Sequence, residues 1–267
     1  MDIADAVVHV ADTPILSLHF TMDAMADRPL THELRRMRRD WDRRARENAR
    51  HYVLTGQDSW SDEEFYRAGE ITMQEDILND LENICQGKCP KDMTVLEIGC
   101  GAGRVTRALA KYFGGVYACD ISHEMVAQAR CAVADFPGAR VFRNNGKDLR
   151  PLWSRWRRWL GLAPAYQFDF AFSTMVFQHI PSRAIVENYV HEVHTLLRPG
   201  GLFKFQVQGS PDIERQMGDT WVGASFSEAD ARQMAERCGF EMRYQAGLGD
   251  QYYWLWFFKP RELARKE

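Results

Sequence analysis

The sequence predicts an α/β protein whose seven-stranded, mostly parallel sheet ends in an antiparallel hairpin, with helices on both faces and a helical cap at the N-terminus. A glycine-rich turn at residues 99–103 joins a short apolar run to a helical pattern. After Pro90, strand-like and helical patterns alternate through short connections, which is typical of a parallel sheet. Only the turn Gln245–Gln251 separates the last two strand patterns. If those strands are neighbours they must be antiparallel, because parallel neighbours need a crossover of about a dozen residues or more.

The size and composition indicate one large globular domain, or one domain with an appendage. The chain has 267 residues, is 45% hydrophobic and carries a formal charge of −3, a near-neutral balance that argues against a dedicated nucleic-acid-binding protein. The longest apolar run, Tyr252–Phe258, is far too short to span a bilayer, and no secretory signal is recognisable. Cys85 and Cys89 have no second pair nearby, which argues against zinc. We therefore expect reduced thiols in a cytoplasmic protein without a transmembrane segment.

The N-terminal region divides into a poorly defined segment, residues 1–30, and a predicted helical cap, residues 31–89. Strand-like patches lie at Val7–Val10 and Ile15–Phe20. From Thr31, the predicted N-cap, to about Tyr52, apolar residues recur at three- and four-residue spacing. This helix is rich in arginine and the segment after it is rich in acids, so we expect the two to complement each other at the surface. A basic helix for nucleic acid or membrane is the alternative.

Residues 90–267 form the predicted main domain. Strands are predicted near residues 93–98, 115–119, 140–144, 168–173, 202–208, 240–245 and 252–259, and helices near 103–113, 122–134, 182–197 and 227–238. An insertion at about residues 149–166 interrupts the alternation, and its first part carries four arginines and three tryptophans without an acid. We expect its rings to pack on the domain while the arginines reach solvent; a lid, a partner surface or a contact with an anionic membrane is the alternative.

Polar residues follow the predicted strands at the edge where open α/β sheets bind their ligands. Asp120 ends the second strand, 19 residues after Gly101, where its carboxylate can accept hydrogen bonds from ribose hydroxyls. Capping of the next helix, together with Ser122, is the alternative. Asn145 and Gly146 follow the third strand and can offer an acceptor and an N–H group to adenine, although by itself the pair is only a turn signature.

The ordered set of motifs resembles that of the class I S-adenosylmethionine-dependent methyltransferases. The resemblance rests on the glycine motif Leu96–Gly103, on Asp120, on the strand Phe168–Phe172 and on the run Leu197–Gly201 before the fifth strand. The terminal hairpin is similar to that family's reversed last strand. The likeness covers about residues 90–260, looks closest to the bacterial small-molecule methyltransferases, and implies a Rossmann-like fold.

The resemblance also implies a cofactor, S-adenosylmethionine, and a set of residues that bind it. Glu97 and the backbone of the glycine turn would hold its amino-acid end, Asp120 the ribose, and Asn145 with Gly146 the adenine. An acid is common in the family at the position of Asn145. The predicted cofactor-binding residues are Glu97, Gly99, Cys100, Gly101, Gly103, Asp120, Ile121, Asn145, Gly146 and Ser173.

Two other classes of function compete with methyl transfer. A nicotinamide-dependent oxidoreductase would carry the fingerprint Gly-x-Gly-x-x-Gly, but Arg104 stands where its last glycine belongs. A non-catalytic scaffold that binds the same cofactor is the other alternative, because a fold does not by itself prove chemistry.

We expect metal-free, in-line methyl transfer to an oxygen or nitrogen atom of a small-molecule acceptor. The run Ser173–Val176 differs from the Asn/Asp-Pro-Pro-aromatic motif of family members that methylate nucleic-acid amines. It also holds no nucleophilic cysteine for cytosine C5 chemistry and no acids for a metal. His179, beyond the fourth strand, is the predicted general base, ahead of Tyr52 and His51. We expect no nucleic-acid partner, and a homo-oligomer is compatible with the sequence.

The acceptor pocket is predicted beneath the segments that lie outside the core. These are the helices of residues 31–70, the insertion and the loop 219–223. The predicted lining residues are Tyr52, Trp60, Gln178, Trp221 and Tyr253. Aromatic residues are equally common in a core, so this set favours an aromatic, largely apolar acceptor only slightly.

Overall fold

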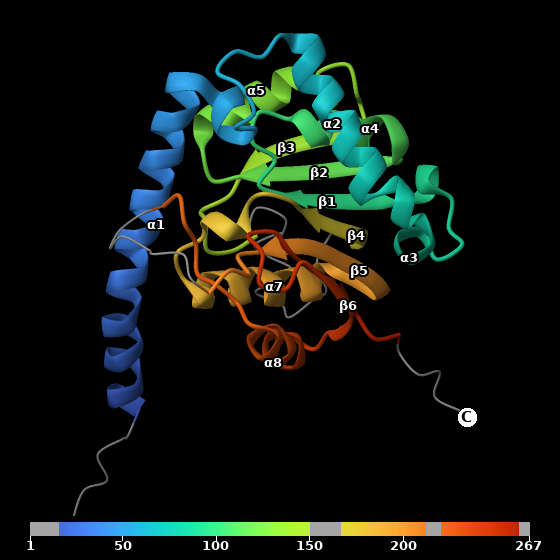
Figure 1. Cartoon of the computed structure of the whole chain (residues 1–267). Helices are drawn as coiled ribbons and strands as arrows, with labels where there is room; N and C mark the ends of the chain where they lie inside the picture. Colours follow the sequence, from blue (N-terminus) through green and yellow to red (C-terminus); the bar gives the residue numbers. More distant parts are fainter. Residues whose placement is uncertain (1–15, 150–166, 212–219, 262–267) are drawn as a thin grey trace, which may run out of the picture.

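A single seven-stranded sheet forms the centre of the protein in the computed structural model, which describes residues 16–149, 167–211 and 220–261, with side chains from residue 32 onward (Figure 1). Its strands are β1 (Thr94–Ile98), β2 (Gly115–Asp120), β3 (Ala139–Arg143), β4 (Phe168–Ser173), β5 (Leu197–Val207), β6 (Glu241–Ala246) and β7 (Tyr253–Phe258). The order is β3-β2-β1-β4-β5-β7-β6, with parallel pairing from β3 to β5 and β7 antiparallel to both of its neighbours. The predicted sheet and its terminal hairpin are confirmed.

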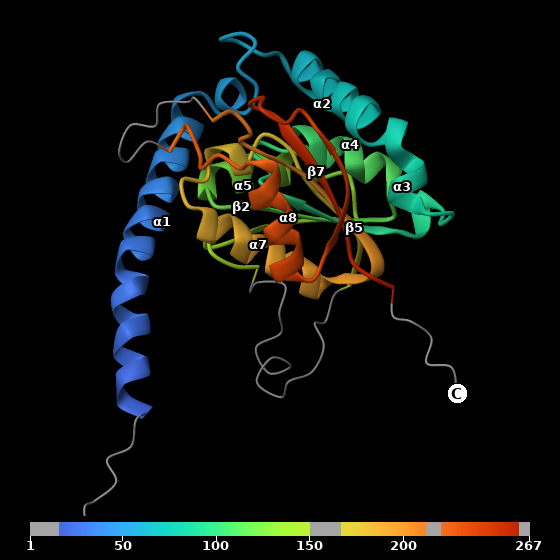
Figure 2. The same cartoon turned by 60° about the horizontal axis from the view of Figure 1, so that its bottom comes forward.

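Helices in the described part of the chain cover both faces of this sheet (Figure 2). They are α1 (Leu16–Val53), α2 (Asp62–Asp76), α3 (Leu81–Cys85), α4 (Arg104–Tyr112), α5 (His123–Ala132), α7 (Arg183–Leu196) and α8 (Glu228–Cys238), with short 3-10 turns η1 (Leu78–Asp80), η2 (Pro90–Asp92) and η4 (Phe177–His179). After Pro90 the predicted element ends agree with these bounds to within two residues, except that β5 already begins at Leu197, where it pairs with Phe168 of β4.

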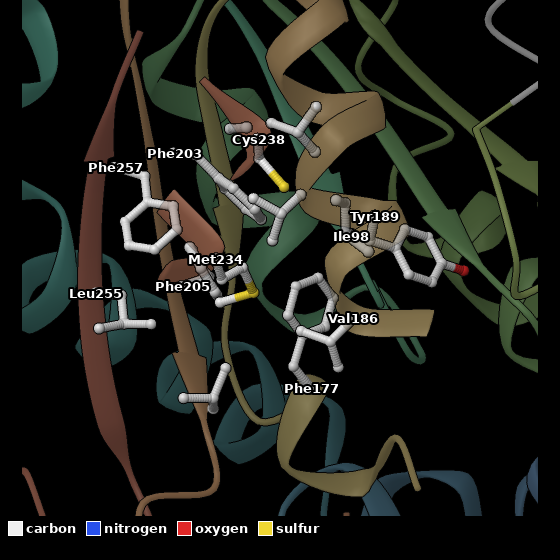
Figure 3. Packing of buried hydrophobic residues seen from close by; sticks show 14 of the residues in the cluster. Ile98, Phe177, Val186, Tyr189, Phe203, Phe205, Met234, Cys238, Leu255 and Phe257 are labelled. Atoms are coloured by element: carbon white, nitrogen blue, oxygen red, sulfur yellow. The ribbon is translucent and has the colours of Figure 1, made fainter. Parts of the chain in front are cut away.

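The aromatic residues of the central strands build the main core on the face covered by α7 and α8. Phe203 and Phe205 of β5 stack with ring centroids 4.2 Å apart, and Phe257 of β7 packs edge-on against Phe205. Val186 of α7 and Met234 of α8 close the cluster from the helix side (Figure 3). This face needs both helices, because alternate side chains of β5 and β7 point into it.

The N-terminal helix starts earlier than the sequence indicated. We predicted a helix from Thr31 and a strand-like patch at Ile15–Phe20, but α1 already begins at Leu16, so both predictions are wrong for the described residues. The apolar residues Leu18, Met22 and Met25 keep the helical spacing of four and three residues. Thr31 lies within the helix and therefore cannot be its N-cap, because an N-cap is the residue at which the chain enters a helix. The patch Val7–Val10 and residues 150–166 of the insertion lie outside the described residues.

Helices α1, α2 and α3 make up the proposed cap, and their charges bind the main domain as well as each other. Arg50 of α1 pairs with Asp62 at the start of α2. Further along the acid-rich segment, Asp80 pairs with the buried Lys204 of β5 at 2.8 Å. The acidic segment therefore neutralises the basic helix only in part, and its other end is tied to the sheet. No helix in the described part of the chain is long and apolar enough to cross a membrane.

Candidate cofactor and active site

The glycine-rich turn after β1 is locked to the end of β2 by its own amides. The N–H groups of Gly99 and Cys100 both donate to the carbonyl of Cys119, at 2.7 and 2.9 Å. The N–H of Gly101 donates to Oδ2 of Asp120 at 3.0 Å. These three amides therefore serve the turn itself, and the first N–H groups of α4, which as in any helix have no carbonyl partner within the helix, follow directly after it.

Two glycines of the turn are required by close packing. Gly99 has a φ of 77°, and a Cβ there would lie 2.2 Å from Cγ2 of Val176, in the loop after β4. Gly103, the N-cap of α4, has a φ of 89°, and a Cβ there would lie 2.9 Å from Cα of Ala129 in α5. Gly99 thus lets the loop after β4 approach the turn, whereas Gly103 serves the contact between two helices.

A pocket of about 870 Å³, including its open mouth, lies over this turn. The predicted residues on its wall are Tyr52, Glu97, Gly99, Cys100, Gly101, Asp120, Ile121, Gly146 and His179. The structure therefore brings the predicted base and most of the predicted cofactor residues into one cavity.

Three hydrogen-bond acceptors line the pocket at the ends of three adjacent strands. They are Glu97 of β1, Asp120 of β2 and Asn144, directly after β3. Oε2 of Glu97 and Oδ1 of Asn144 are buried and have no hydrogen-bond partner among the described residues. Nδ2 of Asn144 donates to the hydroxyl of Tyr189 at 2.8 Å, which turns Oδ1 away from that contact. A buried acceptor without a donor is costly, so this row suits a ligand that carries several N–H and O–H groups.

Burial sets the charge state of the two carboxyls in this row. It raises the pKa of Glu97 to about 7, against the opposing effect of the nearby Arg104 guanidinium. It raises the pKa of Asp120 to about 6, although the backbone amides of Ser122 and Gly101 stabilise the ionised form. The free protein therefore holds Asp120 ionised at neutral pH, with Glu97 close to its midpoint.

The loop after β4 is held in an unusual conformation beside the pocket. Met175 has a φ of 58°, a region that costs a side-chain-bearing residue about 1 kcal/mol or more. Its N–H donates to Oε1 of Gln206 at 2.8 Å, and the hydroxyl of Thr174 donates to the same atom at 3.2 Å. The buried Gln206 of β5 therefore fixes the turn that carries Val176 over Gly99.

His179 and its neighbours form the other end of the pocket. Nδ1 of His179 forms a hydrogen bond with the carbonyl of Trp221, and a carbonyl can only accept, so Nδ1 carries the proton. Nε2 is then the acceptor nitrogen, 3.4 Å from the side-chain amide nitrogen of Gln178. Both ring nitrogens are therefore engaged, Nδ1 by the carbonyl of Trp221 and Nε2 by the side chain of Gln178.

Several predicted residues lie outside the pocket wall. Oδ1 of Asn145 accepts from the N–H of Lys147 and of Asp148, both at 2.8 Å, so this side chain closes its own turn while Asn144 faces the cavity. The hydroxyl of Ser173 donates to the carbonyl of Ile98 at 2.9 Å and ties β4 to β1. Gly103 serves the helix contact described above.

The predicted acceptor residues are divided in the same way. Trp60 donates from Nε1 to the carbonyl of Leu54 at 3.0 Å and packs within the cap. Tyr253 is fully buried in β7, with its hydroxyl on Gln245. Gln178 and Trp221 both contact His179, the first through its side-chain amide and the second through a tilted ring pair with centroids 4.8 Å apart. Only Tyr52 of this group lines the pocket.

Sequence reasoning missed the wall residues that long-range packing supplies. Met37 and Trp41 of α1 were visible only as apolar positions of a helix, and Asn144 and Tyr189 as parts of separate elements. Arg104, buried at the start of α4, donates to the carbonyl of Ala68 at 2.8 Å and also lines the cavity. A helical apolar repeat does not distinguish a core position from a site position.

The fold and the pocket define a class I methyltransferase that uses S-adenosylmethionine. The methyltransferase-domain family matches residues 71–245 of the chain, which covers the sheet from β1 to most of β6. The protein belongs to this family, and the comparisons support an enzyme rather than a nicotinamide-dependent oxidoreductase. No curated protein matches the sequence.

Solved structures of methyltransferases share the fold at low sequence identity. Magnesium protoporphyrin IX methyltransferase from Synechocystis PCC 6803, with bound S-adenosylmethionine, is 16% identical with a TM-score of 0.57, over 85% of this chain and 97% of that one. Phosphoethanolamine N-methyltransferase 1 from Haemonchus contortus is 14% identical with a TM-score of 0.59, over 88% of this chain and 51% of that one. A methyltransferase from Aquifex aeolicus is 17% identical with a TM-score of 0.50, over 75% and 99%.

Proposed function

We propose that the protein transfers a methyl group from S-adenosylmethionine to an oxygen or nitrogen atom of a small molecule, without a metal ion. The observation that supports this proposal is the cavity that brings His179 together with the glycine turn and the row of three acceptors. Nε2 of His179, which faces the side-chain amide of Gln178, would exchange that contact for the acceptor group before it takes a proton. The described residues include no cluster of three or more side chains suited to a metal ion.

Cofactor binding is proposed to use the row of three acceptors. Glu97 would accept from the α-ammonium group, Asp120 from the ribose hydroxyls and Asn144 from the adenine amino group, and these donors follow one another in the same order along the cofactor. Ile121 and Gly146, in contact with each other, would border the adenine. A cation beside Glu97 favours the ionised carboxyl, so binding would lower its pKa from about 7.

The bound cofactor supplies an activated methyl group on a sulfonium centre, and the chain has to orient the acceptor and exclude water. Orientation alone can supply roughly 7–11 kcal/mol. Helix α1 would close the pocket, since Met37, Trp41 and Val53 lie on its wall and a Cβ at Gly101 would lie 2.7 Å from Cγ2 of Val53. Nε2 of His179 would receive the proton that the acceptor loses.

The test is the substitution His179→Ala, with methyl transfer measured over about pH 6–9 and S-adenosylhomocysteine affinity measured by calorimetry. We expect turnover to fall by about 10²–10⁴-fold while the affinity stays unchanged. His191→Ala, at an exposed histidine of α7, is the matched control. Wild-type turnover of the His179 variant over the whole range would remove His179 as the base. Failure of the wild-type protein to bind S-adenosylhomocysteine would overturn the proposed use of the pocket.

A further inference from the structure

Met175, in the loop after β4, combines a costly backbone conformation with a place on the pocket wall. Its φ of 58° lies in the left-handed region, which glycine adopts freely and a residue with a side chain does not. Among the described residues other than glycine, Gln86 alone shares a positive φ, at 49°, and it directly follows the last turn of α3. A left-handed residue is common at the end of a helix. Met175 lies between β4 and η4, so its conformation needs another reason.

The neighbouring side chains hold the backbone of Met175 in this conformation. Its N–H donates to Oε1 of Gln206 at 2.8 Å, and the hydroxyl of Thr174 donates to the same atom at 3.2 Å. Gln206 is buried in β5, so the sheet itself fixes this acceptor. A strained conformation persists only where the surrounding structure enforces it, and such residues cluster at functional sites. The enforced conformation of Met175 therefore indicates a functional role.

Core packing does not explain the conformation. In the described part of the chain, Met175 is neither one of the buried apolar side chains of the core nor one of the partly buried side chains packed against them. The two residues that follow differ in this respect, since Val176 packs against the main core and Phe177 is fully buried in it. Met175 is instead half-buried and lines the pocket. It is therefore available to a ligand.

The loop that carries Met175 reaches the glycine turn from the side of η4. The next residue, Val176, lies over Gly99, where a Cβ would be 2.2 Å from its Cγ2. Gly99 directly follows β1 and donates its N–H to the end of β2. In the proposed binding mode Glu97 of β1 holds the α-ammonium group and Asp120 of β2 holds the ribose. The sulfonium centre joins these two parts of the cofactor, so this loop borders its place in the pocket.

We propose that Met175 is a specificity-determining residue, which lies against the alkyl group on the sulfonium and limits that group to a methyl. This inference rests on the proposed function. The left-handed backbone brings the side chain to the group that is transferred, and the unbranched thioether fills the space around a methyl. An ethyl group adds one methylene, against which a close-fitting apolar site discriminates by about 10–200-fold. Because methionine is flexible, the lower end of this range applies here.

The test is calorimetric titration of the whole chain with three ligands. They are S-adenosylmethionine, S-adenosylethionine, which carries an ethyl group in place of the methyl, and S-adenosylhomocysteine, which carries neither. We expect the wild-type protein to bind S-adenosylethionine about tenfold more weakly than S-adenosylmethionine. Met175→Gly opens space beside the sulfonium and suits the left-handed backbone, so this ratio should fall to about threefold or less. Affinity for S-adenosylhomocysteine, which has no alkyl group on sulfur to contact, should change by less than about threefold.

The matched control is Gln86→Gly, which makes the same change at the other left-handed residue. The side-chain amide of Gln86 donates to the carbonyl of Gly200 at 2.8 Å, near the end of β5 opposite to Gln206. This variant should keep the wild-type ratio of affinities. Met175→Ala is the second test variant, because it shortens the side chain at an unchanged backbone. It should lower the ratio as Met175→Gly does, and it decides the question if the glycine variant does not fold.

Three results would overturn the role of Met175 while the proposed use of the pocket stands. The first is equal binding of the methyl and ethyl ligands by the wild-type protein. The second is a folded Met175 variant that keeps the wild-type ratio. The third is an equal loss of affinity for all three ligands in the variants, which would indicate a purely structural residue. Absence of binding of both S-adenosylmethionine and S-adenosylhomocysteine by the wild-type protein would overturn the proposed function as well.

Discussion

The substitution Gly69→Ala tests whether the cap holds the start of α4, next to the glycine turn, in place. In a solvent-facing helix, alanine in place of glycine stabilises by about 0.5–1 kcal/mol. Gly69 of α2 is buried, and a Cβ there would lie 2.2 Å from the carbonyl oxygen of Arg104 and 2.8 Å from its carbonyl carbon. The first contact falls 1.2 Å short of the 3.4 Å at which ordinary contact begins. Both partners are backbone, so α2 has to move away from α4.

The expected change in folding stability has the opposite sign to the change that helix propensity alone would predict. Overpacking of a well-packed site costs about 1–3 kcal/mol, and the propensity gain offsets part of it. We therefore expect a net loss of roughly 1–2 kcal/mol, which lowers the melting temperature by about 2–8 °C in a domain of this size. Arg104 donates to Ala68 and Thr72 of α2 and lines the pocket, so affinity for S-adenosylhomocysteine should fall as well.

The assay is thermal unfolding together with calorimetric titration of S-adenosylhomocysteine. Ile71→Ala, at a half-exposed position of the same helix, is the matched control and should change stability by no more than about 0.5 kcal/mol. A Gly69→Ala protein that melts at or above the wild-type temperature would refute the close contact. A protein that melts lower but binds the cofactor product normally would refute the link between α2 and the pocket.

Three further predictions concern the carboxylates of the acceptor row, the Lys204–Asp80 pair and Gln206. Affinity for S-adenosylhomocysteine should be full above about pH 8 and decline in two steps as the pH falls, because protonation removes the carboxylate first at Glu97 and then at Asp120, and Asp120→Asn should remove the lower step. Lys204→Met should destabilise by about 1–3 kcal/mol in denaturant unfolding, because Asp80 loses its cation and keeps only the donors of Trp256 and Asn83. The additional change Asp80→Asn should restore part of the loss. Gln206→Met should weaken cofactor-product binding by leaving the amide of Met175 unpaired, whereas Gln206→Glu, which keeps an acceptor, should bind more tightly than Gln206→Met.

The parts of the fold that the sequence predicted depend on local pattern. The strand–helix alternation after Pro90, the glycine turn and Asp120 at the end of the second strand need only short-range signals, because burial alternation and turn chemistry act over a few residues. The start of α1 could not be predicted in this way, since a threonine at residue 31 is compatible with both a cap and a helix interior. Upstream, the helical spacing of Leu18, Met22 and Met25 overlaps the strand-like run Ile15–Phe20, so the same residues fit both patterns.

The choice between Asn144 and Asn145 shows why the site was only partly predictable. Neighbouring residues at a strand end point in opposite directions, so an error of one position exchanges a wall residue for a turn residue. Asn144 is turned inward by Tyr189, 45 residues later, and Asn145 is turned outward by the amides that follow it. The first of these contacts belongs to tertiary packing, which a single sequence does not display.

The two halves of the pocket differ in how they are built, and this difference has a consequence for specificity. The donor half consists of the ends of β1, β2 and β3, which the sheet itself fixes at neighbouring positions. The proposed acceptor half is assembled from α1, η4 and the segment 220–226, which are joined through Thr220 on Asp40 and Arg44, and through Gly223 on the carbonyl of Gln178. We therefore expect a substitution in one of these three segments to shift the other two more than it shifts the strand ends. Changes of acceptor preference should accordingly arise from residues of α1 and of the segment 220–226, with little change in cofactor affinity.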